Sequence, residues 1–414
     1  WLALAWCVAL WFLEPDLGYF FVMWWAQHLP GMSPFLKGAI VTFVYTAFYI
    51  SLPYACLSLL LPALCDQKQA NGENLSKTYG LNTMAFLAGV LLFGWALQYV
   101  HPFYAARIFA LMAAAGMLLL SIQKWGQALA VRTIAVPAIL LGAGFVLAPS
   151  SLSMRLIVSA TAGTVPVMFE STPQHLFWIK TEPGGRPTSL MFDNHSMSGV
   201  DRAAQRYMRL MVHFPLLLQP HPRNVLLICY GVGSTADSIR QHSTIERVDV
   251  LDLNASVFRL SRAFDYVNHR VLADPKFALI VDDGRQFLRL TTNQYDLVSL
   301  EPPPPLKQGV SRLYSREFYR DVLDRLAPGG FVSQWLPEEW LTQGAVDLIV
   351  RTFVDSFPHA FCFSGADRNL ILVGSNKPIL LEHLESRFAS ERLVQQDMAR
   401  FALEDTRFLL GAII

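Results

Sequence analysis

The stretch NVLLICYGVGS, residues Asn224–Ser234, decides the fold of this chain. After its first residue it is continuously apolar as far as Cys229, as expected of a parallel strand buried on both faces. Gly231 and Gly233 then let the backbone turn tightly and approach a ligand, and a helix with free N–H groups is expected to begin near Thr235. The pattern predicts the first strand–turn–helix unit of a nucleotide-binding α/β domain. It is one glycine short of GxGxxG, so a tight turn without a ligand stays an open alternative.

A second strand, Arg247–Asp252, ends in an acid about 20 residues after Gly233. A carboxylate at this strand tip can accept hydrogen bonds from ribose hydroxyls. Asp252 can equally be the N-cap of a helix that is expected to begin near Ala255. The two roles are compatible, and we predict ribose binding.

Two further strands end in acids at the same expected sheet edge. Residues 278–284, ALIVDDG, indicate a buried strand, and the Asp283 carboxylate after it can accept from an adenine amino group. The alternative is that Asp283 caps the next helix. Residues 295–301, YDLVSLE, place Glu301 at a strand's carboxyl end, where α/β sheets hold reacting groups. Three acids and a glycine turn at one sheet edge together indicate a nucleotide-binding site more specifically than any one of these features alone.

The chain around this sheet divides into four parts. The segments Phe177–Lys180 and Ser189–Phe192 flank the turn EPGG and predict a hairpin, and Asp201–Phe214 predicts a helix ended by Pro215. We expect transmembrane helices over residues 1–150, a small β domain with a connecting helix over 165–215, a Rossmann-like domain of S-adenosylmethionine-dependent methyltransferase type over 216–376, and a helical tail over 377–414.

The transmembrane block is predicted from composition. Hydrophobic residues make up 53% of the chain and charged residues 16%, with a mean hydropathy of +0.34. Membrane spans, each near the length of about 20 residues that a bilayer requires, are expected at 39–64, 81–100, 104–122 and 133–148, after a remnant at 1–13 and an interfacial aromatic stretch at 19–30. Buried helices of a large soluble protein are the alternative. The chain begins at Trp1 within an apolar run, so we expect residues to be missing at one or both ends.

Charge and cysteine content exclude several classes of function. A net charge of +1 gives no electrostatic case for nucleic-acid binding. The five cysteines are scattered without a CxxC pair, so neither a disulfide framework nor a zinc site is expected. No ionisable residue lies in the middle of a predicted span, which argues against transport by this block alone.

Several motifs from about Glu170 to Gly374 resemble the spermidine synthase (polyamine aminopropyltransferase) family. They are the glycine turn, the stretches DLNASV at 252–257 and DGRQFL at 283–288, LYSREFY at 313–319, and LAPGG at 326–330. With its apolar N-terminal block, the whole chain is similar to the membrane-fused variety of that family.

The resemblance implies a cofactor, S-adenosylmethionine or its decarboxylated form, and a set of site residues. The implied cofactor-binding residues are Tyr230, Gly231, Gly233, Asp252 (on the ribose), Asp283 (on the adenine) and Gly284. It implies that Glu301 acts on the attacking amine as the catalytic residue, and that the amine is bound by Gln174, Tyr207 and Tyr314. An adenosylated sulfonium compound is cytoplasmic, so we expect the α/β domain in the cytoplasm and the chain in a bacterial-type inner membrane, although basic residues near the spans favour the opposite orientation by a narrow margin.

The chain departs from the family at the acceptor site. Pro304 stands where the family has a second aspartate, and the acidic pair expected before Tyr207 is missing. Losing these acids weakens the binding of a doubly cationic amine. Two functions therefore remain open: an enzyme that transfers an aminopropyl or methyl group to an amine acceptor, and a catalytically degenerate subunit or scaffold of a larger membrane complex. The expected partners are the lipid bilayer with subunits of such a complex, or a small amine.

Overall fold

The structure, a computed structural model, describes residues 72–96, 169–171, 176–182, 184–192, 195–305, 309–366 and 368–414. The chain divides into two compact units, one of residues 1–166 and 171–176 and the other of residues 167–170 and 177–414. The described residues of the candidate site lie in the second unit.

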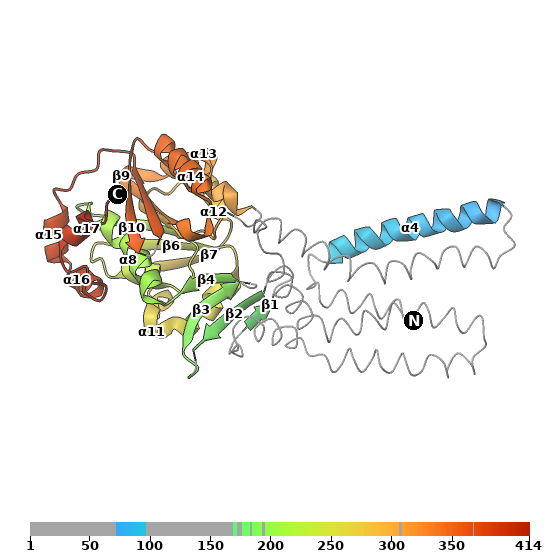
Figure 1. Cartoon of the computed structure of the whole chain (residues 1–414), viewed down its shortest axis with the longest axis horizontal. Coiled ribbons are helices and arrows are strands. Elements are labelled where there is room, and N and C mark those ends of the chain that lie inside the picture. Colours follow the sequence, from blue (N-terminus) through green and yellow to red (C-terminus); the bar gives the residue numbers. More distant parts are fainter. Residues whose placement is uncertain are drawn as a thin grey trace, which may run out of the picture. The chain divides into compact units, whose positions relative to one another are not determined.

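In the first unit the structure describes one helix, α4 (Gly72–Ala96), drawn in blue in Figure 1. It contains most of the predicted span at 81–100. Within the described ranges, no helix has both the length and the apolarity that crossing a bilayer requires, so the structure does not support this span. The predicted spans at 39–64, 104–122 and 133–148, and the segments 1–13 and 19–30, lie outside the described residues.

The small β domain is a four-stranded sheet in the order β1-β2-β3-β4. Its strands are β1 (Phe169–Ser171), β2 (Leu176–Thr181), β3 (Pro187–Phe192) and β4 (His195–Gly199). Strands β2 and β3 pair antiparallel, with Trp178 opposite Met191, which confirms the predicted hairpin. Consecutive residues of β2 and β3 are buried, namely Phe177, Trp178 and Ile179 on β2 and Leu190 and Met191 on β3. Because neighbouring residues of a strand point to opposite faces, side chains on both faces of this pair are buried.

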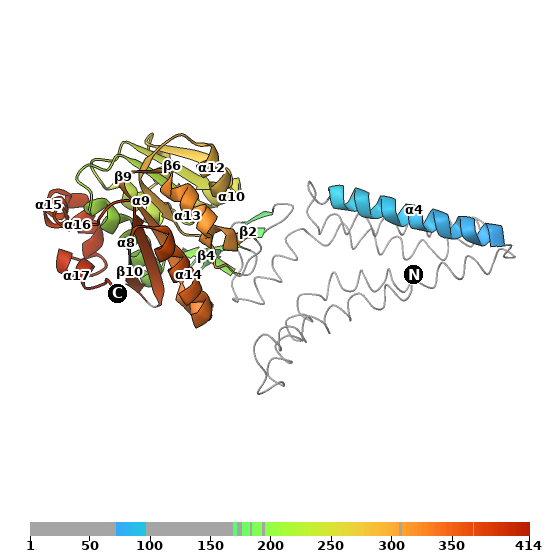
Figure 2. The same cartoon turned by 90° about the horizontal axis from the view of Figure 1, so that it is seen from above.

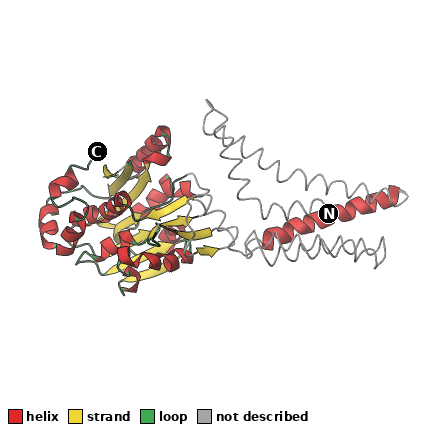
Figure 3. Ribbon diagram, turned by 60° about the horizontal axis from the view of Figure 1, so that its bottom comes forward, coloured by secondary structure: helices red, strands yellow, loops and turns green. Residues whose placement is uncertain are grey.

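The second sheet has seven strands in the order β10-β11-β9-β8-β5-β6-β7. Strands β5 (Asn224–Ile228), β6 (Arg247–Asp252), β7 (Phe277–Val281), β8 (Tyr295–Leu300) and β9 (Leu326–Pro337) run parallel, and β10 (His359–Ala366) and β11 (Asn369–Ser375) complete the sheet antiparallel. The predicted Rossmann-like α/β domain is confirmed, with a mixed sheet. Helices lie on both sides of it (Figure 3).

Each face of this sheet has its own hydrophobic core. On one face Val225 and Leu227 pack with α8 (Arg202–Leu217), α9 (Ser234–Arg240) and α10 (Ala255–Leu260). On the other face Leu226 packs with α12 (Gly284–Leu290), α13 (Arg316–Leu323) and α14 (Gln343–Ser356). Figure 2 shows α12, α13 and α14 with the sheet. Because neighbouring residues of β5 point to opposite faces, its continuous apolar run supplies both cores.

The tail forms three short helices, α15 (Leu384–Ser390), α16 (Arg392–Ala399) and α17 (Thr406–Leu410). It packs on the first core through residues such as Val394 and Met398. The structure also contains α11 (Asp265–Asn268) and the 3-10 turns η1 (Ser261–Phe264), η2 (Val271–Ala273), η3 (Val310–Tyr314) and η4 (Glu338–Trp340).

Two local predictions are wrong. Helix α8 does not end before Pro215 but continues to Leu217, because a proline in the last turn removes only one hydrogen bond and the residues after it are buried. Strand β7 is not buried on both faces. It is the edge strand, and Leu279 and Val281 are 45% and 55% exposed.

Candidate functional site

The glycine turn between β5 and α9 has a left-handed backbone. Gly231 has a φ of 59° and Gly233 a φ of 88°. A Cβ on Gly231 would lie 2.7 Å from Ser198 Oγ, and one on Gly233 would lie 2.3 Å from the hydroxyl of Tyr230. Both glycines are therefore required by backbone conformation and by neighbouring side chains, Ser198 of the small β domain and Tyr230 of the turn itself. The hydroxyl of Ser198 also accepts a hydrogen bond from Val232 N at 3.3 Å. The sequence analysis did not predict that Ser198 contacts the turn.

Tyr230 contacts its surroundings through both its ring and its backbone. Its side chain is 2% exposed and lies against the ring of Phe258, with 5.4 Å between the centroids. Within the described part of the chain its hydroxyl has no hydrogen-bond partner. Its backbone N–H donates to Asp252 Oδ2 at 3.1 Å. The cofactor contact of Tyr230 stays a prediction.

Asp252 ends β6 with both carboxylate oxygens engaged. Besides Tyr230 N, Asn254 N donates to it at 3.1 Å, and the side chain is 7% exposed. Burial raises the pKa of Asp252 to about 6, and the backbone hydrogen bonds oppose this shift. The N-cap of α10 is Asn254, so the helix-cap interpretation of Asp252 is wrong. A carboxylate has about four lone-pair sites, which leaves acceptor capacity for hydroxyl groups.

Asp283 does cap a helix, as the alternative interpretation proposed. Its carboxylate accepts from Arg285 N at 2.9 Å and from Arg285 Nη2 at 3.0 Å, at the start of α12. Burial raises the pKa of Asp283, but the hydrogen bonds from Arg285 outweigh it and hold the pKa below its ordinary value. A Cβ on Gly284 would lie 2.8 Å from Ile228 Cγ2, so this glycine allows close packing of α12 on β5.

The three predicted acids follow strands that end at one edge of the sheet. Strands β8, β5, β6 and β7 are parallel neighbours in this order, so their carboxyl ends lie at the same edge. Burial raises the pKa of Cys229, at the end of β5, and the negative charges of Asp252, Glu301 and Asp283 raise it further. Leu253, next to the Asp252 carboxylate, is 75% exposed and adds an apolar surface that was not predicted.

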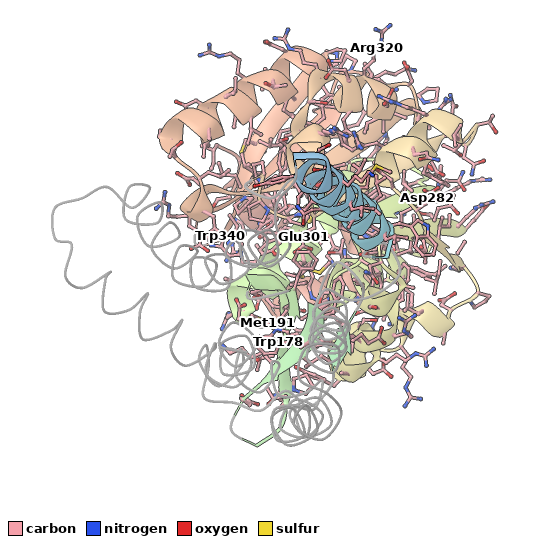
Figure 4. All side chains as sticks on the ribbon, turned by 90° about the vertical axis from the view of Figure 1, so that its right-hand side faces the viewer. Trp178, Met191, Asp282, Glu301, Arg320 and Trp340 are labelled. Atoms are coloured by element: carbon pink, nitrogen blue, oxygen red, sulfur yellow. The ribbon has the colours of Figure 1, made fainter. Side chains whose placement is uncertain are left out.

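Glu301, like Asp252, is a buried carboxylate. It is 9% exposed, and its Oε1 accepts a hydrogen bond of 2.6 Å from the hydroxyl of Tyr207 on α8. Burial raises the pKa of Glu301 to about 8, and the Tyr207 hydrogen bond lowers it in part. Within the described residues, Oε2 accepts no hydrogen bond. Figure 4 labels Glu301 in the domain.

Tyr207 is held by an aromatic stack. Its ring lies on that of Trp335 with 5.2 Å between centroids and 9° between planes, and Trp335 Nε1 donates to Asn369 Oδ1 at 2.8 Å. Burial and the charge of Glu301 raise the pKa of Tyr207 well above its ordinary range, so the phenol keeps its proton and donates. Tyr207 and Glu301, predicted separately as substrate-binding and catalytic residues, form one unit.

Tyr314 and Gln174 are the other residues predicted to bind the amine. Tyr314 is buried, and its hydroxyl donates to the carbonyl of Pro303 at 3.2 Å, which fixes the proline run after Glu301. Gln174 lies outside the described residues.

A separate cavity of about 280 Å³ opens beside Tyr230. None of the three strand-end carboxylates lines it. Its walls are Tyr230, Ser261, Arg262, Asp265, Asn268, Arg270, Leu272 and Ala273.

In the described part of the chain, no three His, Cys, Asp or Glu side chains are grouped so as to hold a metal ion.

Comparisons with known proteins confirm the resemblance over the domain that carries this site. Residues 204–364 match the family described as Spermine/spermidine synthase domain. A polyamine aminopropyltransferase of Thermococcus onnurineus is 28% identical over 188 residues, which cover 44% of this chain and 61% of that protein. One from Klebsiella pneumoniae is 32% identical over 158 residues, which cover 35% and 54%. The chain thus spans less than two thirds of the length of these relatives.

Solved structures also match. A spermidine synthase in complex with the transition state analogue AdoDATO is 18% identical, with a TM-score of 0.47 over 56% of this chain and 88% of that one. On the sequence matches, residues 204–364 are similar to the spermine/spermidine synthase domain family.

Proposed function

We propose that this domain binds S-adenosylmethionine or its decarboxylated form and transfers an aminopropyl or methyl group to an amine. The observation that carries the proposal is the buried Glu301–Tyr207 pair at the end of β8, at the sheet edge where Asp252 and Asp283 also lie. Its sequence relatives are named polyamine aminopropyltransferases, which supports this class of reaction.

The residues at the sheet edge fit such a cofactor. Asp252 keeps lone pairs for ribose hydroxyls, and Asp283, which is 37% exposed, can accept from an adenine amino group. The exposed Leu253 offers an apolar surface beside them. When bound, the sulfonium compound supplies an electrophilic carbon.

Glu301 acts as the base in this proposal. An amine must lose a proton as its nitrogen forms the new bond, and a carboxylate whose pKa is about 8 holds that proton well near neutral pH. Tyr207 binds Oε1 and thereby leaves Oε2 for the amine. The stack on Trp335 keeps Tyr207, and through it Glu301, in one orientation.

The acceptor is expected to carry one positive charge. Glu301 is followed by Pro302, Pro303, Pro304 and Pro305, so no carboxylate follows it within this run. A second ammonium group would be desolvated there without a partner, at a cost of several kcal/mol. A monoamine avoids this cost.

Calorimetric titration of the detergent-purified chain with S-adenosylmethionine, its decarboxylated form and methylthioadenosine tests the cofactor. We expect micromolar binding of at least one of them. Asp252→Ala should weaken it at least about tenfold, since a hydrogen bond to a charged group contributes about 1.5–3 kcal/mol. Asp321→Asn, a change in a surface ion pair on α13, is the matched control. If the unaltered chain binds none of the three, the proposal is wrong.

The catalytic role of Glu301 is tested with Glu301→Gln. Glutamine can still accept from Tyr207 but cannot take a proton from the amine. Turnover with monoamines should fall about 10²–10⁴-fold while cofactor affinity stays unchanged. Turnover that survives the substitution would remove Glu301 from the mechanism.

A second candidate function is a catalytically inactive subunit of a membrane complex. Two observations favour it: the Asp283 carboxylate is already paired with Arg285, and a rigid proline run follows Glu301. This function predicts that a stoichiometric membrane partner copurifies with a chain that binds no adenosyl compound. We further propose that the N-terminal block attaches the chain to the inner membrane with the domain in the cytoplasm.

A further inference from the structure

A row of polar side chains runs along α8, on a different face from Tyr207. Gln205, Arg209 and His213 follow one another at intervals of four residues, so they share one face of the helix. All three are buried, with exposures of 6%, 1% and 0%. The Glu301 site uses none of them directly.

This row connects the C-terminal tail to the glycine turn. Asp397 on α16 accepts from Arg209 Nη1 at 2.6 Å and is bonded to His213 Nε2 at 3.0 Å. Arg209 Nη2 in turn donates to Gln205 Oε1 at 3.2 Å. Gln205 Nε2 donates to Ser234 Oγ at 2.6 Å. Ser234 directly follows Gly233, so an unbroken chain of hydrogen bonds leads from Asp397 to the turn.

The energetics of this network favour a role in positioning. Asp397 is 4% exposed, and replacing a buried ion pair with apolar side chains is often neutral or stabilising. A fully hydrogen-bonded network instead holds the elements that share it in one defined arrangement. Here those elements are the tail, α8 and the start of α9.

Arg209 has a competing partner. Asp237 Oδ2 lies 3.6 Å from Arg209 Nη1, and Asp237 is buried on α9. Its other partners are Arg240, Gln241 and His269. If Asp397 lost its charge, the guanidinium would be drawn toward Asp237. It would then release Gln205 Oε1, and of the other hydrogen bonds of this amide only the one of 3.4 Å to the carbonyl of Gly199 would still orient it toward Ser234. The hydrogen bond to Ser234 should weaken as a result.

We propose that Asp397 is a positioning residue for the glycine turn, acting through Arg209 and Gln205. Asp397 lies beyond residues 204–364, the range of the family match. Its importance for binding rests on the proposed function, whereas its effect on the turn does not.

Hydrogen exchange of the full, ligand-free chain tests the effect on the turn. In Asp397→Asn, exchange over residues 230–236 should accelerate about tenfold, while residues 295–300 in β8 keep their protection. Arg209→Lys keeps the charge but cannot bind Asp397 and Gln205 together, and it should give the same result. It also covers the case in which Asp397→Asn fails to fold. Asp405→Asn changes another tail aspartate, whose partners Thr406 and Arg407 are local, and should change neither segment.

Two outcomes would overturn the proposal. One is unchanged exchange at 230–236 in a folded variant, and the other is an equal acceleration at 295–300, which indicates general loss of stability. Affinity for S-adenosylmethionine and methylthioadenosine should fall about tenfold in the same variants, within the range usual for coupled sites. If the unaltered chain binds neither compound, the proposed function fails while the exchange result still decides the role of Asp397.

Discussion

At the scale of single residues, the proposed base Glu301 should set the pH dependence of turnover. A base must be unprotonated, and burial holds the pKa of Glu301 at about 8. We therefore expect kcat/KM to rise as pH rises through about 8. Tyr207→Phe removes the hydrogen bond that lowers this pKa, so the rise should move to higher pH. The measurement is a pH–rate profile, with Tyr266→Phe, a half-exposed tyrosine, as control. An unmoved profile in Tyr207→Phe would separate Tyr207 from the base.

Gly233 shows how tightly the turn is built. Gly233 and Gly329 have φ values of 88° and 83°, yet a Cβ would clash only at Gly233. Alanine at Gly329 should cost about 1 kcal/mol for its left-handed backbone. At Gly233 the contact with Tyr230 adds overpacking, and the total should reach about 3 kcal/mol. Chemical denaturation of both variants measures the difference. Equal losses would mean that the Tyr230 ring moves aside freely.

At the scale of elements, strands were easier to predict than their surroundings. The strand ends at Asp252 and Glu301 could be predicted because an apolar run stops at each of these acids, which is a local signal. The exposure of β7 depends on its place at the sheet edge, and the continuation of α8 past Pro215 depends on what packs around it. Neither is encoded in the local pattern.

In the candidate site, too, local features could be predicted from the sequence and long-range contacts could not. The three strand-end acids could be predicted, because parallel strands bring their carboxyl ends to one edge. The Tyr207–Glu301 hydrogen bond joins residues 94 apart, and the Arg209–Asp397 bond joins residues 188 apart. Such pairs arise from the packing of α8 between the sheet and the tail, which periodicity does not reveal. The sequence predicted a helical tail but not its contact with α8.

The docking of α16 should depend on acid pH through Asp397. Burial raises the pKa of Asp397, but its hydrogen bond and charge interaction with His213, and those with Arg209, bring it down to about 2. A lowered carboxyl pKa stabilises the fold above its unfolded value of about 4, and the contribution is lost as pH falls toward 2. The shift corresponds to about 2 kcal/mol. Unfolding free energies measured between pH 5 and 2.5 should therefore fall less steeply in Asp397→Asn. Identical slopes would contradict this.

At the scale of the whole molecule, residues from 167 onward have what an independent domain needs. Both faces of the seven-stranded sheet carry their own buried core, and the tail belongs to one of these cores. With the exception of residues 171–176, all of this segment groups as one compact unit. The described parts of the site lie within it. Folding and cofactor binding by this unit should consequently not require residues 1–166.

A chain of residues 167–414 separates the two roles assigned to the protein. Because the strongly apolar segments precede residue 167, this shortened chain should stay in the supernatant after cell lysis and alkaline extraction, whereas the full chain should stay with the membranes. Both should bind S-adenosylmethionine or methylthioadenosine equally, since Asp252, Asp283 and Glu301 are common to them. A full chain released by alkali would contradict membrane attachment. A soluble short chain that has lost the affinity of the full chain would show that the N-terminal block takes part in the site.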